Sequence, residues 1–219
     1  FATATYEQRP VPAGVDWEEA RTAARYHGLI PLANHFLRHA GDVAPAEFKS
    51  LVHRDCLLSV AQSIHRAYEF HLVLQALRDA GISALVLKGP ALAATVYPEP
   101  TLRPFNDLDL VCHEEDWVAV HKAMLALGFA PVLNQGTPPP RIWDRRAHHH
   151  MVYVNSKQIA VEVHFGDLWQ IGLRPRLEQQ YWERAIPATI AGVQTKILAA
   201  ADQVLHLCVH LHKHSCYKL

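Results

Sequence analysis

Two aspartates separated by a single residue, Asp107 and Asp109, have a spacing that predicts chemistry. Asp107 directly precedes a short apolar run at 108–111 that is typical of a buried strand, and Asp109 lies within this run. Side chains alternate between the two faces of a strand, so both carboxylates share one face while Leu108 and Leu110 point into the core. Two like charges so close are costly unless a cation neutralises them, and carboxylate oxygens suit Mg²⁺ or Mn²⁺.

A structural role is the alternative for the same pair, because Asn106 followed by Asp107 is a favourable turn sequence and an Asp-x-Asp pattern alone is a weak signal. A third acidic residue, Glu162, lies in a second predicted strand at 159–165, where it shares one face with His164. An acidic residue in the middle of a strand either faces solvent or completes a metal site. The residues alone leave these two interpretations equal.

A further strand is predicted at 83–87, and a short helix at 91–96 follows it. Gly89 between them lets the backbone approach a ligand, and free amides at the start of a helix attract an anion. This stretch is therefore a candidate phosphate cradle. Lys88 and Arg103 are the basic side chains that could contact a triphosphate there, although either could instead form a surface ion pair.

Helical segments are expected on both sides of this core, which predicts an α/β (α+β) fold with a small mixed sheet and packed helices. We expect an N-terminal helical region at 1–80, a catalytic core at 81–170 and a C-terminal helical region at 171–219. The predicted elements outside the acidic strands are two short helices within 16–40, a long helix at 46–80, a helix at 117–128, a hairpin partner strand at 151–155 and a final histidine-rich helix.

The composition is that of an ordinary globular protein, with 219 residues of which 50% are hydrophobic, and a net charge of +0. A neutral chain has no electrostatic footprint for long nucleic acid or for an anionic membrane surface. No stretch reaches the roughly 20 apolar residues of a membrane span, and four scattered cysteines do not make a disulfide framework. We therefore expect a cytoplasmic protein with reduced thiols. Because it starts at Phe1 and not at Met, we expect it to be a portion of a longer chain.

Histidines gather in two places and raise the question of zinc. One group is the run at 148–150, and the other is His206, His210 and His214, which recur every four residues along one helix face. Two such histidines can bind Zn²⁺, but no Glu follows His206, so the HExxH protease motif is absent. The alternative is that this last helix packs beside the sheet with its histidines polar or facing a substrate.

The stretch LKGPALAATVYPEPTLRPFNDLDLVC, at 87–112, resembles the polymerase-β-like nucleotidyltransferase superfamily, and within it the bacterial family of uncharacterised nucleotidyltransferases. In that group an L-K-G start, a Tyr-Pro pair, an Arg-Pro pair and a D-x-D-L end occur together. The similarity covers roughly residue 51 to the C-terminus and includes VEVHF at 161–165. Pro90 is a departure, because many members have Ser or a second Gly there, and proline removes an amide and a hydroxyl from the phosphate loop.

The resemblance implies a metal-dependent enzyme that moves a nucleoside monophosphate from an NTP, expected to be ATP, to a hydroxyl-bearing small molecule, peptide or protein. A nucleotide- or partner-binding module without catalysis is the alternative, since a fold does not guarantee chemistry. The retained acidic cluster argues against that alternative. The site residues that the resemblance implies are Asp107, Asp109 and Glu162, as catalytic ligands of two Mg²⁺ or Mn²⁺ ions with Glu162 on the ion nearest the acceptor; the phosphate-binding Lys88, Gly89 and Arg103; and His164, which would position the acceptor or a metal.

Overall fold

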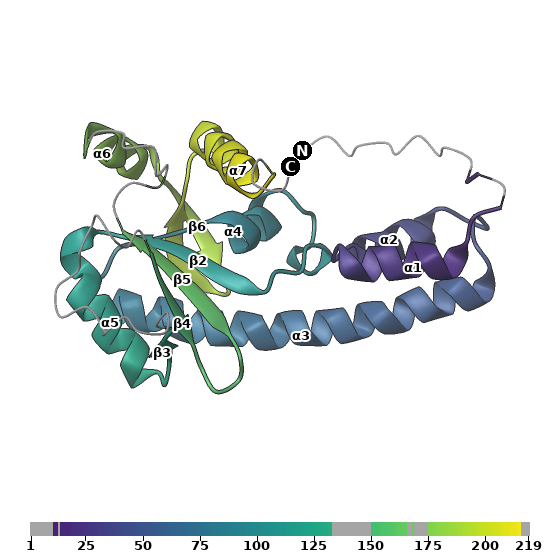
Figure 1. Cartoon of the computed structure of the whole chain (residues 1–219), viewed down its shortest axis with the longest axis horizontal. Helices are drawn as coiled ribbons and strands as arrows, with labels where there is room; N and C mark the ends of the chain where they lie inside the picture. The colour runs from purple at the N-terminus through teal and green to yellow at the C-terminus, as the bar shows by residue number, and fades with distance from the viewer. Residues whose placement is uncertain (1–10, 13, 133–149, 166–167, 169–174, 216–219) are drawn as a thin grey trace.

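A computed structural model describes residues 11–12, 14–132, 150–165, 168 and 175–215 of the chain. It shows a mixed seven-stranded sheet with helices on both faces and a group of helices that extends to one side (Figure 1). The predicted fold class is confirmed. The proline-rich stretch at 135–140 and two members of the histidine run, His148 and His149, lie outside the described residues.

The first helices of the chain are α1 (Trp17–Tyr26), α2 (Ile30–His39) and α3 (Ala46–Asp79). Asp16 caps α1, because its carboxylate accepts from two backbone amides of the first turn at 3.0 Å each. Arg21 of α1 binds Asp55 of α3 with two hydrogen bonds, from Nε at 2.7 Å and from Nη2 at 3.1 Å. The two short helices and the long helix predicted from apolar spacing are all present.

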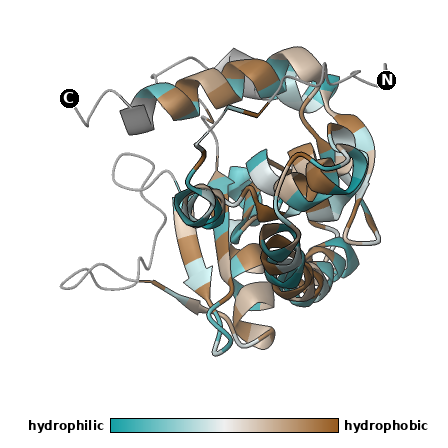
Figure 2. Cartoon of the chain, turned by 90° about the vertical axis from the view of Figure 1, so that its right-hand side faces the viewer, coloured by the Kyte–Doolittle hydropathy of each residue, from teal (hydrophilic) through white to brown (hydrophobic). Residues whose placement is uncertain are grey.

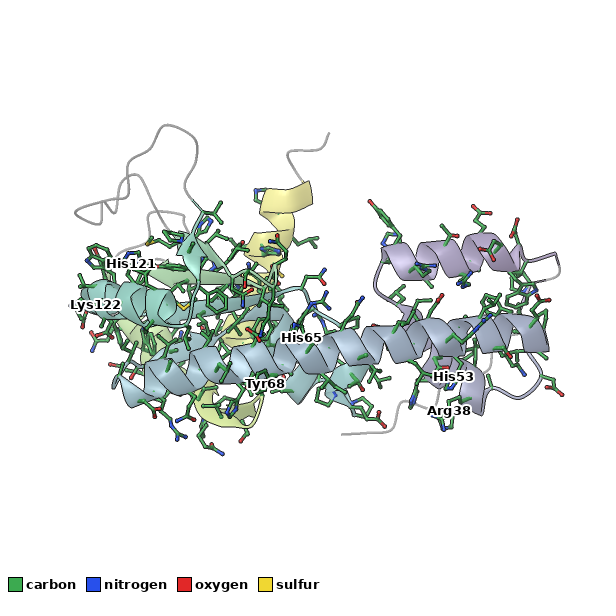
Figure 3. The ribbon with its side chains drawn as sticks, turned by 90° about the horizontal axis from the view of Figure 1, so that it is seen from below. Arg38, His53, His65, Tyr68, His121 and Lys122 are labelled. Atoms are coloured by element: carbon green, nitrogen blue, oxygen red, sulfur yellow. The ribbon has the colours of Figure 1, made fainter. Side chains whose placement is uncertain are left out.

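The long helix α3 has 34 residues and joins the N-terminal helices to the sheet (Figures 1 and 3). Its C-terminal half packs on the sheet through Phe70 and Val73, which are fully buried. Its middle carries apolar side chains that face solvent, such as Leu58 at 66% exposure and Ile64 at 62%. Figure 3 shows this helix from below, with Tyr68 labelled near its middle. The packing on α3 therefore lies at its two ends.

The strands are β1 (Ala84–Val86), β2 (Asp107–Cys112), β3 (Ala130–Pro131), β4 (His150–Val154), β5 (Ala160–Phe165), β6 (Ile186–Ile190) and β7 (Val193–Ile197). Their order in the sheet is β3-β4-β5-β2-β1-β7-β6. β2 pairs with β5 in parallel and with β1 in antiparallel, and β1 pairs with β7 in parallel. The two strands that carry the acidic residues are thus neighbours in the middle of the sheet.

The remaining helices are α4 (Lys88–Thr95), η1 (Pro100–Leu102), η2 (Glu114–Asp116), α5 (Trp117–Ala126), α6 (Pro175–Arg184) and α7 (Ala200–Ser215). α3 and α5 lie on one side of the sheet, and α6 and α7 lie on the other (Figure 1). Figure 2 shows hydrophobic residues on both the strands and the helices. Strand alternation divides β2 between the two cores: Leu108 and Leu110 pack with α3 and α5, whereas Val111 packs with residues of α6 and α7.

The sheet continues beyond residue 170, where only helices were expected. β6 and β7 form a hairpin there, and β7 joins β1 through the pairs Leu85 with Lys196 and Val86 with Ile197. Ala191 and Gly192 turn the chain with φ values of 49° and 78°, the positive values that a tight two-residue hairpin turn requires. The strand signal was weak because β6 is an edge strand that contains a proline.

In the described ranges, no helix has both the length and the apolar character needed to cross a membrane. The final helix α7 appears where a histidine-rich helix was predicted, and the hairpin of β4 and β5 appears where alternating residues predicted it.

Candidate active site

Three carboxylates lie on one face of the sheet because of the register between β2 and β5. Asp109 on β2 is paired with Glu162 on β5, and Asp107 is paired with Ala160. Paired residues of neighbouring strands point to the same face. Since Leu108 between the aspartates is buried against the α3 side, the carboxylates face the layer that contains α6 and α7. The structure thus brings together the two aspartates and the glutamate that the sequence singled out.

Lys88 and His164 complete a compact cluster around Asp109. The Lys88 Nζ atom donates to Asp109 Oδ1 at 2.6 Å, and His164 Nε2 lies 3.2 Å from the same oxygen. Glu162 Oε2 lies 4.0 Å from Lys88 Nζ and 3.8 Å from His164 Nε2. The Asp109 side chain is only 1% exposed, whereas that of Glu162 is 29% exposed. Asp109 is therefore the buried centre of the cluster and Glu162 is its accessible edge.

The surroundings change the pKa values of the three acids in different directions. Burial raises the pKa of Asp109, but the hydrogen bond to His164 and the charge of Lys88 outweigh it and lower the pKa to about 2. The pKa of Asp107 is raised, first by burial and then by the neighbouring charge of Asp109. The pKa of Glu162 is raised for the same two reasons. Asp109 is thus held ionised by its partners. An additional cation would stabilise the ionised forms of Asp107 and Glu162.

The donor atoms of the cluster fit a divalent cation. One ligand atom from each of Asp109, Glu162 and His164 lies within 4.8 Å of the others, and Asp107 is on the same face two residues before Asp109. Carboxylate oxygens are the ligands that Mg²⁺ and Mn²⁺ prefer, and Mn²⁺ also accepts an imidazole nitrogen. The residues that would hold such an ion are the three carboxylates, with His164 as a nitrogen ligand or a hydrogen-bond partner.

Helix α4 starts at Lys88, three residues earlier than the sequence predicted, and β1 ends at Val86. Pro90 fits in the first turn of α4 because the amide it lacks would have no partner within the helix. Lys88 has a φ of 47°, in a region that residues other than glycine rarely adopt. The preceding amide, Leu87 N–H, donates to the backbone oxygen of Asp109 at 2.9 Å. The backbone at the start of α4 is therefore fixed against β2.

Gly89 lies in a closely packed position in the first turn of α4. A Cβ atom added there would be 2.7 Å from the Cβ of Phe105 and 3.2 Å from Nη1 of Arg103. Packing alone therefore requires a glycine at this position, independently of any phosphate. The same distances place the Arg103 side chain beside the start of α4, which is where a phosphate contact was predicted. Phosphate binding by Gly89 and Arg103 remains a prediction.

His206 on α7 belongs to the surroundings of the cluster, in agreement with the expectation that this helix packs beside the sheet. Its side chain is buried, at 5% exposure. Its pKa is lowered to about 4, chiefly by burial and also by the nearby side chains of Lys88 and His164. α7 is fastened to α6 one turn earlier, because Arg184 binds both carboxylate oxygens of Asp202, at 2.7 and 2.8 Å.

The zinc alternative gains no support from the described residues. Their side chains form one group of three or more potential ligands, Asp109, Glu162 and His164, and neither His206 nor His210 belongs to it. His150, the described member of the other histidine run, lies on β4 with its ring 5.3 Å from that of His164. This run therefore ends beside the acidic cluster.

A family comparison identifies the class of protein. The profile of a family described as uncharacterised nucleotidyltransferase matches residues 13–219, so the chain belongs to this family. The resemblance found from the motif at 87–112 is confirmed. Among curated proteins there is no sequence match.

Solved structures with a related arrangement are also nucleotidyltransferases or resemble them. The lincomycin-bound lincosamide antibiotic adenylyltransferase LnuA has a TM-score of 0.43 at 12% identity, over 63% of this chain and 83% of its own. The antibiotic-resistance factor ANT(2'')-Ia has a TM-score of 0.49 at 10% identity, over 72% and 77%. An antigenic nucleotidyltransferase-like protein from Paracoccidioides brasiliensis has a TM-score of 0.36 at 19% identity, over 60% of each chain.

Proposed function

We propose that this protein transfers a nucleoside monophosphate from an NTP, expected to be ATP, to a hydroxyl group, with the help of Mg²⁺ or Mn²⁺. The observation that carries the proposal is the pairing of Asp109 with Glu162 on neighbouring parallel strands, in a chain that belongs to a nucleotidyltransferase family. Carboxylates gathered on one face without a metal role would be a cost to stability. A metal-binding role accounts for them.

The residues have separate tasks in this proposal. Asp107, Asp109 and Glu162 would hold the metal, which when bound would neutralise charge on the transferring phosphoryl group. Arg103 and the backbone at Gly89 would bind the other phosphates of the NTP. The acceptor oxygen forms a bond to the α-phosphorus, the bond from that phosphorus to the bridging oxygen breaks, and pyrophosphate leaves. The acceptor hydroxyl passes its proton to a carboxylate of the cluster in the same step.

The expected class of acceptor follows from the net charge of the chain. The net charge of +0 gives no basic surface for long nucleic acid, so a hydroxylated small molecule, a peptide or a protein side chain is the expected acceptor. Cys56, Cys112 and Cys208 are free thiols. Free thiols are stable in a reducing compartment, so we expect the reaction to take place in the cytoplasm.

The test is to incubate the protein with each of the four NTPs, Mg²⁺ and a host-cell extract, and to measure two products. Pyrophosphate release reports the leaving group, and mass spectrometry reports an added nucleotide on any component of the extract. The Asp109→Asn variant is the negative control, and Asp42→Asn, in an exposed position outside the site, is the matched control. Activity in the wild type and in Asp42→Asn, but not in Asp109→Asn, is the expected result.

A binding module without catalysis gives a different result in the same experiment. It would bind a nucleotide, measured by calorimetry, yet release no pyrophosphate and modify no component with any NTP. That outcome would replace the proposed transferase by a nucleotide-binding protein on the same fold.

A further inference from the structure

The Lys88 side chain contacts two carboxylates of the acidic cluster. Its Nζ atom lies 2.6 Å from Asp109 Oδ1 and 4.0 Å from Glu162 Oε2. The Lys88 side chain is 16% exposed and points into the acidic cluster. The ammonium group thus occupies the space between two carboxylates that would otherwise be ligands of a shared metal.

The backbone holds Lys88 in this place. It directly follows Leu87, whose amide bonds to the backbone oxygen of Asp109, and directly precedes Gly89, which packs against Phe105 without room for a methyl group. Lys88 itself has a φ of 47°, so the chain adopts an uncommon conformation at the residue that delivers the ammonium. These constraints on both sides leave the Cα atom of Lys88 fixed relative to Asp109.

A metal ion and the ammonium cannot share this position. A Mg²⁺ ion lies about 2.1 Å from a ligand oxygen, and Asp109 Oδ1 already has the Lys88 nitrogen at 2.6 Å. Two cations on one oxygen repel each other strongly in a buried site, where the dielectric constant is low. A divalent ion can instead bind at Asp107, a half-buried carboxylate on the same face of the sheet, and at the second carboxylate oxygen of Asp109.

We propose that the Lys88 ammonium is the permanent cation between Asp109 and Glu162, so that the centre binds one divalent ion, at Asp107 and Asp109. The proposal rests on the proposed function and specifies its site: a single-metal nucleotidyltransferase in which a lysine takes the place of a second ion. In this more specific form of the proposed site, Glu162 no longer holds the metal. It accepts the proton of the acceptor hydroxyl as the new oxygen–phosphorus bond forms, and pyrophosphate carries away the electrons of the broken bond.

The experiment counts bound Mn²⁺ by electron paramagnetic resonance, first with Mn²⁺ alone and then with the α,β-methylene analogues of the four NTPs, which cannot be cleaved at the α-phosphorus. The wild type is expected to bind one Mn²⁺ per chain. Lys88→Ala, which removes the ammonium and leaves space, is expected to bind two. Lys88→Arg keeps the charge and is expected to bind one, as is Lys122→Ala, a lysine removal at an exposed position on α5 (Figure 3).

Thermal unfolding supplies a second measurement on the same variants. Removing Lys88 leaves Asp109 without its ammonium, so Lys88→Ala is expected to melt below the wild type without metal and to gain more from saturating Mn²⁺ than the wild type does. An equal gain in both proteins would overturn the proposal.

The remaining outcomes separate this proposal from the proposed function. Two Mn²⁺ ions in the wild type, or one in Lys88→Ala, would overturn the role of the lysine while the transferase activity stands. One Mn²⁺ in the wild type and two in Lys88→Ala, without binding of any nucleotide analogue or transfer from any NTP, would support the role of the lysine and overturn the transferase.

Discussion

Gly89 and Phe105 are packed so closely that no side chain fits between them: a Cβ atom on Gly89 would be 2.7 Å from the Cβ atom of Phe105. Phe105 cannot easily give way, because its ring stacks on that of Phe70 in α3, with centroids 5.6 Å apart. The start of α4 is thus locked between the loop before β2 and the core of the sheet. A glycine that sequence analysis associated with phosphate binding has a structural function as well.

The first prediction is that Gly89→Ala lowers the free energy of unfolding by about 1–3 kcal/mol, the usual cost of adding atoms to a well-packed site. Urea denaturation measures this loss. Nucleotide affinity, measured on the folded fraction of the same preparation, then tests the phosphate cradle. Normal affinity once folded would leave Gly89 with the packing function alone, whereas a further tenfold loss would support the cradle.

The second prediction concerns Asp107, whose pKa is raised by burial and by Asp109. Asp107→Asn removes a repelled charge, so we expect the stability of the metal-free protein to be unchanged or slightly higher. Metal-dependent nucleotide affinity should fall at least tenfold, which is about 1.4 kcal/mol. Calorimetry with Mg²⁺ and an uncleavable NTP analogue measures the affinity, with Asp42→Asn as control. Unchanged affinity would place the metal elsewhere.

The third prediction separates chemistry from binding at Glu162, the accessible edge of the cluster. Glu162→Gln keeps the shape of the side chain but cannot take a proton, so turnover should drop by roughly 10²–10⁴-fold while nucleotide affinity stays within threefold of the wild type. Glu115→Gln, at an exposed position on η2, is the control and should match the wild type. Parallel losses of turnover and affinity would instead make Glu162 a ligand needed for nucleotide binding.

The fourth prediction is a pH dependence of stability that comes from His206, whose folded pKa of about 4 lies below the ordinary histidine value of 6.5. Between these values the unfolded chain binds a proton that the folded protein does not, so the stabilisation is present above pH 6.5 and is lost as the pH falls. We expect a loss of about 2 kcal/mol between pH 7.5 and 5. His206→Asn should remove it, and His65→Asn, on the exposed part of α3, should not.

Asp109 does not contribute to the change in stability between pH 7.5 and pH 5. Its pKa is lowered to about 2, so the stability it contributes is present above its ordinary value of 3.8 and is lost only as the pH falls from there toward 2. Lys88, His164 and His210 are the other charged or titratable groups near His206. Urea denaturation of the metal-free protein at each pH measures the effect, and an unchanged slope in His206→Asn would contradict it.

Local patterns predicted most of the elements that carry the site. The apolar runs before Lys88 and around Asp109 became β1 and β2, and the alternation around Glu162 became β5. Alternation also predicted that Asp107 and Asp109 share a face. These features depend on a few consecutive residues, so local sequence patterns are enough to predict them.

Contacts between distant elements could not be predicted in the same way. That Lys88 faces Asp109 follows from the antiparallel pairing of β1 with β2 and from the early start of α4, which no local pattern defines. The position of His206 depends on how α7 docks, which the Arg184–Asp202 ion pair helps to fix. The hairpin of β6 and β7 was not predicted, because β6 is an edge strand that contains a proline and most of its side chains are not buried.

The pairing of β1 with β7 has a consequence for how the chain folds as it is synthesised. The three carboxylates are all translated by residue 162, but the partner of Leu85 is Lys196, 111 positions later in the chain (196 − 85). Until β7 emerges from the ribosome, one edge of β1 stays unpaired, and an open apolar edge is a site of mispairing and aggregation. Such distant pairing also slows folding. The nascent protein thus passes through an interval in which its acidic residues exist but the sheet that must hold them is incomplete, and a chaperone that covers the β1 edge would act in that interval.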